Sequence, residues 1–109
     1  MTYNEFKLEW DKVVQNELAM LKKYALLTDI EYNECCFLFD FMYEYDNNFI
    51  CNNCPLYNDD NKDSSLCAQF NLTNNITKRY LIYFAIKNIL NKYDCKILYN
   101  KYKSKIEKS

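Results

Sequence analysis

The clearest chemical pattern in this sequence is its set of cysteines. Six cysteines lie among 109 residues, and the chain contains no histidine. The two-residue gap in Cys51-Asn52-Asn53-Cys54 lets two thiolates point at one ion from a tight turn, and Cys67 supplies a third ligand farther along the chain. Tetrahedral zinc needs four ligands at about 2.3 Å. The sequence therefore predicts a structural zinc site formed by Cys51, Cys54, Cys67 and Cys36.

The fourth ligand is the least constrained member of this site. Cys36 is the first choice, followed by Cys35, by Cys95 and by an aspartate of the 59–63 segment. Cys35 is also interpreted as a small buried core residue. Two other interpretations stay open, an iron–sulfur cluster and a set of disulfides or plain thiols, although a cytosolic setting argues against disulfides.

The composition excludes several classes of active site. The chain has no His, no Gly and one Pro. Without histidine there is no imidazole base for a serine or cysteine protease triad. Without glycine there is no phosphate-cradling loop and no dinucleotide-binding fingerprint. The adjacent carboxylates Asp59 and Asp60 lie in a polar loop, where solvation is their ordinary role, so we predict that the protein is not an enzyme.

Charge is unevenly distributed along the chain although the formal net charge is only −1. Residues 28–63 hold nine acids and one lysine, a net charge of −8. Residues 76–109 hold nine basic residues and two acids, a net charge of +7. The acids are Asp29, Glu31, Glu34, Asp40, Glu44, Asp46, Asp59, Asp60 and Asp63, and the basic residues at helical spacing are Lys78, Arg79, Lys87, Lys92 and Lys96.

These two charged segments are either solvated faces that partly neutralise each other or binding surfaces. Carboxylates interleaved with tyrosine can occupy a basic groove that normally takes nucleic acid. Lysines at helical spacing can instead bind phosphates directly. A sequence pI of about 5.4 argues against a dedicated nucleic-acid binder, so direct nucleic-acid binding is the alternative interpretation.

Hydrophobic spacing predicts a mostly α-helical single domain over residues 1–109, with the metal-clipped loop between helices. A capping box at Thr2 and Glu5 begins a helix over 3–27, whose apolar stripe is Phe6, Trp10, Val14, Leu18, Leu21 and Ala25. A second box at Thr28 and Glu31 favours a helix over 28–46; the alternative is an α+β fold with an aromatic strand at about 36–46.

The rest of the chain is predicted as a loop followed by a basic helix. Residues 47–75 form the loop, with a short helical turn ending at Phe70. The last helix begins near Asn74 or Asn75, breaks near 91–94, and leads to a basic tail, 101–109, that we expect to fray. We expect no secretory leader and no membrane span, and therefore a cytoplasmic protein.

The turn Cys51-Asn52-Asn53-Cys54-Pro55-Leu56, followed by Cys67, resembles a pattern in small accessory proteins of bacteriophages and mobile elements, a class that includes anti-CRISPR inhibitors. The resemblance covers about 17 of 109 residues and carries no catalytic residue. It implies a phage-type accessory protein that acts in the host cytoplasm. Together with the acidic, tyrosine-rich middle segment and the lack of catalytic residues, it predicts an inhibitor of a larger host protein, such as a nucleic-acid-binding nuclease. The alternative is a small nucleic-acid-binding regulator that uses the basic C-terminal helix.

Overall fold

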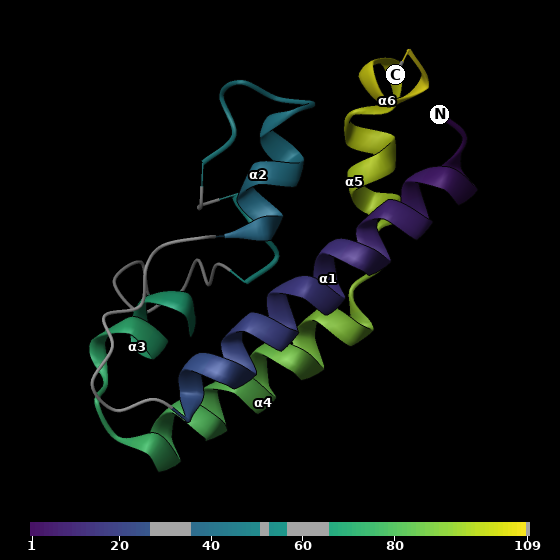
Figure 1. The fold of residues 1–109 in the computed structure, drawn as a ribbon. Coiled ribbons are helices and arrows are strands. Elements are labelled where there is room, and N and C mark those ends of the chain that lie inside the picture. The colour runs from purple at the N-terminus through teal and green to yellow at the C-terminus, as the bar shows by residue number, and fades with distance from the viewer. Residues whose placement is uncertain (27–35, 51–52, 57–65, 109) are drawn as a thin grey trace.

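The computed structural model describes residues 1–26, 36–50, 53–56 and 66–108. Within these ranges the chain forms helices and no strand, which confirms the predicted mostly-α class. Figure 1 shows two long helices, α1 and α4, side by side, with α2 and α3 on one flank and α5 and α6 near the N-terminus. The helices are α1 Tyr3–Ala25, α2 Phe37–Tyr43, α3 Leu66–Leu72, α4 Ile76–Lys92, α5 Lys96–Lys101 and α6 Lys103–Glu107.

The start of α1 is fixed by the predicted capping box. The Thr2 hydroxyl accepts a hydrogen bond from the Glu5 backbone N–H at 3.2 Å. In return, the Glu5 carboxylate accepts one from the Thr2 backbone N–H, also at 3.2 Å. These two bonds satisfy donors that the first helical turn leaves without a partner in the helix.

The apolar stripe of α1 forms the centre of the core, as its spacing predicts. All six of its side chains are buried. The Phe6 ring lies 5.5 Å from Phe41 and 5.9 Å from Tyr99, so a single side chain joins α1 to α2 and α5. The stripe is Phe6, Trp10, Val14, Leu18, Leu21 and Ala25.

The strand alternative at about 36–46 is wrong, because residues 37–43 form α2. The Cys36 sulfur accepts a hydrogen bond from the Phe39 backbone N–H at 3.4 Å and caps the helix. The Glu17 carboxylate of α1 accepts another from the Phe37 backbone N–H at 2.9 Å. Local capping therefore decides the conformation that the aromatic pattern left ambiguous. The proposed capping box at Thr28 and Glu31 lies outside the described residues.

The C-terminal third divides where the sequence predicts. Helix α4 begins after Asn75, whose side-chain oxygen accepts a hydrogen bond from the Lys78 N–H at 3.1 Å. It ends at Lys92, and the Asp94 carboxylate then accepts a bond from the Lys96 N–H at 3.0 Å, at the start of α5. Within the basic tail 101–109, for which fraying is predicted, residues 103–107 form α6, and Ile106 is fully buried in the core.

The loop predicted over 47–75 contains α3, which runs two residues beyond the expected turn at Phe70. Phe70 is 1% exposed, so α3 is held to the rest of the molecule by its own aromatic side chain. The described part of this region gives no support for a metal clip. Among the described helices, none has both the length and the apolar character needed to cross a bilayer.

Replacing Phe6 with alanine tests the centre of this core. We expect Phe6→Ala to lower the free energy of unfolding by about 3–5 kcal/mol, because the fully buried ring leaves a cavity. The matched control is Leu8→Ala on the same helix, which is 62% exposed and should change stability by less than about 0.5 kcal/mol. Urea unfolding followed by circular dichroism measures both; equal effects would contradict the packing described here.

Candidate functional site

The four residues of the predicted zinc site are only partly placed. Cys51 lies outside the described residues, as does Cys35. Cys36, Cys54 and Cys67 are half-buried and packed against the core. In the described ranges, no three Cys, His, Asp or Glu side chains come close enough together to hold an ion. The zinc site and the iron–sulfur alternative therefore stay predictions.

Cys36 lies in an environment that favours the neutral thiol. Burial, together with the nearby Glu17 carboxylate and Cys54 thiol, raises the pKa of Cys36 to about 12. Burial likewise raises the pKa of Glu17, whose side chain is 1% exposed. The hydrogen bond from Phe37 opposes that shift, because it favours the ionised carboxylate. The hydrogen bond from the Phe37 N–H to the Glu17 carboxylate therefore anchors α2 on α1.

The acidic residues of the middle segment have different surroundings. Asp29, Glu31, Glu34, Asp59, Asp60 and Asp63 lie outside the described residues. Asp46 is used internally: its carboxylate accepts hydrogen bonds from the Asn48 N–H at 2.9 Å and from the Tyr102 hydroxyl at 3.0 Å. Asp40 and Glu44 are exposed on α2 and form no ion pair with any described residue.

The predicted basic residues are likewise divided. Lys78, Lys87 and Lys92 are exposed on α4. Arg79 is 5% exposed, and its guanidinium donates to the backbone oxygens of Thr73 at 2.7 Å and Tyr24 at 3.5 Å. The Lys96 ammonium lies 6.0 Å from the centre of the Tyr3 ring. Arg79 therefore ties the α3–α4 corner to the end of α1 and does not face a ligand.

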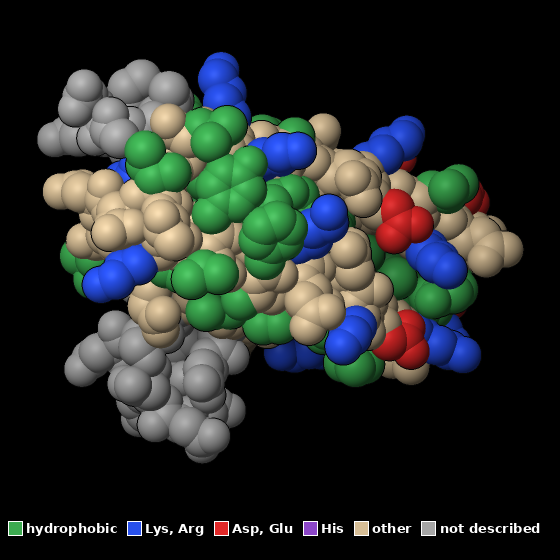
Figure 2. All heavy atoms as spheres, turned by 90° about the horizontal axis from the view of Figure 1, so that it is seen from below, with side chains coloured by type: hydrophobic (Ala, Val, Ile, Leu, Met, Phe, Trp, Pro, Cys, Tyr) green, Lys and Arg blue, Asp and Glu red, His purple; other side chains and the backbone are tan. Residues whose placement is uncertain are grey.

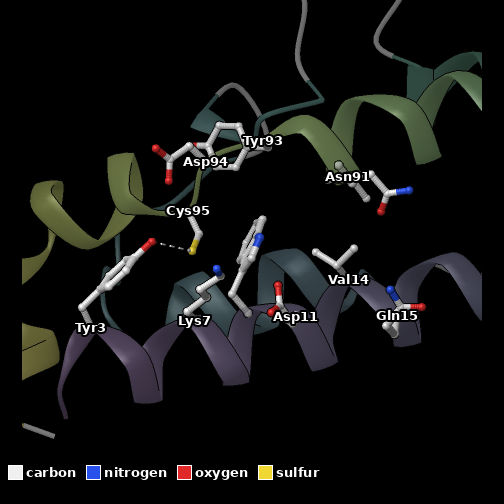
Figure 3. A pocket seen from close by; sticks show the side chains of 11 residues that line it. Tyr3, Lys7, Asp11, Val14, Gln15, Asn91, Tyr93, Asp94 and Cys95 are labelled. Carbon is white, nitrogen blue, oxygen red and sulfur yellow. Dashed lines mark hydrogen bonds between the residues drawn. The ribbon is translucent and has the colours of Figure 1, made fainter.

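A cavity of about 420 Å³ lies between α1 and the junction of α4 with α5 (Figure 3). The Tyr3 hydroxyl and the Cys95 sulfur approach to 4.0 Å within it, and burial raises the pKa of both groups. Lys7 contributes a positive charge, whereas Asp11 and Asp94 contribute negative ones. Because both signs line the cavity, charge alone selects neither an anion nor a cation.

Glu17 was not singled out from the sequence, and Arg79 was predicted as an exposed basic residue, but both are buried. Each occupies a position that continues a buried stripe. Glu17 follows Trp10 and Val14 at seven- and three-residue spacing, and Arg79 precedes Tyr83 and Ile86 at four- and seven-residue spacing. A charged residue on a stripe is the signal that could have found them.

With the fold and these surfaces described, the chain can be compared with known proteins. It matches no protein-family model, no curated protein and no solved structure.

The Asp46–Tyr102 hydrogen bond predicts a pH-dependent stability. Burial and the Asp46 carboxylate raise the pKa of Tyr102 to about 12, so the neutral phenol stabilises the fold. This stabilisation is complete below the ordinary tyrosine pKa of 10 and is lost as pH rises through about 12. The pKa of Asp46 is lowered, chiefly by the Asn48 N–H, so its contribution is lost as pH falls below the ordinary aspartate range.

We expect Tyr102→Phe to lower Tm at pH 7 by about 4–8 °C and to remove part of the loss of stability between pH 10 and 12. Tyr43→Phe is the control, because Tyr43 is 48% exposed on α2. Melting curves from circular dichroism at pH 7 and pH 11 measure both. A control that loses as much stability as Tyr102→Phe would show that the hydrogen bond is not responsible.

The zinc prediction is tested by metal content. We expect about one zinc per chain in protein purified without chelator, and a large loss of zinc in Cys54→Ser. Cys95→Ser tests a lower-ranked choice of fourth ligand: it should keep its zinc if Cys36 is the fourth ligand and lose it if Cys95 is. Elemental analysis and melting curves with and without chelator measure the result. A metal-free protein whose Tm does not change with chelator would refute the zinc site. A brown protein that contains iron would establish the iron–sulfur cluster instead.

Proposed function

We propose that this protein is a small non-catalytic inhibitor that binds a larger nucleic-acid-handling enzyme through an acidic, tyrosine-bearing surface. The observation that carries the proposal is the outward face of α2, formed by Asp40, Tyr43 and Glu44. Tyr43 and Glu44 lie three and four residues after Asp40, so both are neighbours of Asp40 on the helix surface. All three side chains are exposed.

The charge on this face is uncompensated. The sequence contains no basic residue between Lys23 and Lys62, and neither Asp40 nor Glu44 pairs with a described cation. Uncompensated carboxylates create a negative field that attracts a basic groove and speeds association with it. Backbone phosphates present the same sign of charge to such a groove, which is why an acidic protein surface can replace a nucleic acid there.

Tyr43 supplies the contact area that charge alone lacks. It is 48% exposed, and its ring stacks on Phe39 with centroids 5.9 Å apart and planes 18° apart. The support from Phe39 holds the ring in place before binding, so little side-chain entropy is lost. Tyrosine is enriched among the residues that dominate binding energy at protein interfaces. An exposed, supported aromatic ring beside exposed carboxylates therefore supports a protein–protein interface.

The resemblance at the Cys51–Cys54 turn adds the proposed setting, a phage-type protein acting in the host cytoplasm against a defence enzyme such as a nuclease. Direct nucleic-acid binding is the weaker proposal. Of its five residues, Arg79 is buried and bonded to backbone oxygens, which leaves lysines alone on that surface.

The test is capture of a partner from a lysate of the cells that naturally make the protein, followed by quantitative mass spectrometry. We expect a nucleic-acid enzyme that excess duplex DNA releases from the tagged protein. Asp40→Asn/Glu44→Gln should reduce its recovery by about tenfold, because two carboxylates that face the groove are lost. Glu9→Gln/Glu107→Gln is the matched control, since it removes two exposed carboxylates from α1 and α6 and should leave recovery unchanged.

Two results would reject the proposal. One is a partner whose recovery changes neither with excess duplex DNA nor with the Asp40→Asn/Glu44→Gln substitutions. The other is that the purified protein binds labelled duplex DNA directly and that Lys78→Gln/Lys87→Gln abolishes this binding. That result would establish the nucleic-acid alternative.

A further inference from the structure

Helix α4 is apolar on two opposite sides, and only one side is covered. Tyr83, Ile86 and Leu90 face the core and are at most 5% exposed. On the other side Leu81 is 65% exposed and Phe84 is 53% exposed. A helix that is apolar all round is normally buried all round. The uncovered side therefore has the composition of an interface.

This side of α4 forms part of a wider surface. Figure 2 shows hydrophobic side chains gathered on the underside of the molecule, where α4 lies, with Lys and Arg side chains between and around them. At the start of the helix Ile76 is 39% exposed, and Leu72 at the end of α3 is 82% exposed. Exposed apolar side chains thus occur at the end of α3 and in the first half of α4.

The spacing along α4 is that of a helix-pairing seam. Thr77, Leu81, Phe84 and Asn88 follow one another at intervals of four, three and four, and all four are exposed. This is the spacing of the a and d positions of a heptad, with Leu81 and Asn88 at a and Thr77 and Phe84 at d. A helix docks on such a seam by placing its side chains between those of the seam, so no preformed groove is needed.

The lysines of α4 lie at the heptad positions whose charge determines which helix can pair with the seam. In this register Lys78 and Lys92 fall at e and Lys87 falls at g, the positions that flank the seam. No Asp or Glu occurs between Asp63 and Asp94 in the sequence. Glutamates at the e and g positions of a partner helix would pair with these lysines. A second copy of α4 would instead bring lysine against lysine, which disfavours self-association.

We infer that the outward face of α4 binds an acidic amphipathic helix of another protein, with Leu81 and Phe84 in the seam and Lys78, Lys87 and Lys92 paired with its carboxylates. This occupant is favoured over single-stranded nucleic acid because Leu72, Ile76 and Leu81 are aliphatic, which leaves Phe84 as the one ring among these four side chains on which a base can stack. The inference is independent of the acidic face of α2.

The test uses two synthetic amphipathic helical peptides with leucine at every a and d position, one with glutamate and one with lysine at e and g. Fluorescence anisotropy of each labelled peptide is measured against the full chain. We expect the glutamate peptide to bind with Kd on the order of 10 µM and the lysine peptide at least about tenfold more weakly. Added salt should weaken the glutamate complex.

Variants separate the seam from the charges. Leu81→Ser/Phe84→Ser should abolish binding, whereas Leu8→Ser, an exposed leucine of α1, should leave it unchanged. Lys78→Glu/Lys87→Glu should bind the glutamate peptide more weakly and the lysine peptide more tightly than the wild type does. Misfolding cannot produce this reversal of preference. Because these side chains are exposed, all variants should keep the wild-type circular dichroism spectrum.

Three outcomes would overturn the inference. The first is equal binding of both peptides, or no binding of either. The second is a dimer of the wild-type chain in sedimentation that Leu81→Ser/Phe84→Ser dissociates, because a second copy would then be the occupant. The third is a labelled single-stranded oligonucleotide that binds through Leu81 and Phe84 when the glutamate peptide does not.

Discussion

One buried carboxylate fixes the middle of the chain to its first helix. Glu17 is almost fully enclosed on α1, and its oxygen accepts a hydrogen bond from the first backbone N–H of α2, at Phe37. A buried polar group is tolerated when it is hydrogen-bonded, and this bond also satisfies a donor that α2 cannot satisfy itself. Because the start of α2 is fixed, Leu38, Phe41 and Met42 turn inward and the acidic face turns outward.

Helix α1 thereby supports two surfaces of opposite charge. It packs against α2 through the rings of Phe6, Phe41 and Tyr45, and against α4 through the remainder of its apolar stripe. Arg79 provides the second buried polar link, from α4 to the Thr73 and Tyr24 oxygens. The hydrogen bonds of Glu17 and Arg79 thus fix the positions of α2 and α4 relative to α1 more specifically than apolar packing alone does.

Much of this arrangement follows from local rules that the sequence displays. Capping at Thr2, the α1 stripe and the break near Asp94 depend on residues only a few positions apart, and all three were predicted. The burial of Arg79 and of Glu17 was not predicted. Arg79 donates to the Tyr24 oxygen, 55 residues away, and Glu17 accepts from the Phe37 N–H, 20 residues away, so their burial becomes visible only when those partners are placed. Ile97 shows the reverse case: it lies seven residues after the buried Leu90, where an unbroken helix would bury it, but it is 60% exposed, since the chain changes direction before α5.

The placement of α2 and α4 on different sides of α1 has a consequence for motion in solution. Exposed carboxylates on one helix and exposed lysines on another give the described part of the molecule a permanent electric dipole moment. A charged macromolecule exerts a torque on that moment before the surfaces touch. Near a basic surface the exposed carboxylates of α2 are attracted and the exposed lysines of α4 are repelled, which biases the approach, and near an acidic surface the signs reverse. Physiological salt confines this bias to roughly the last 8 Å of approach.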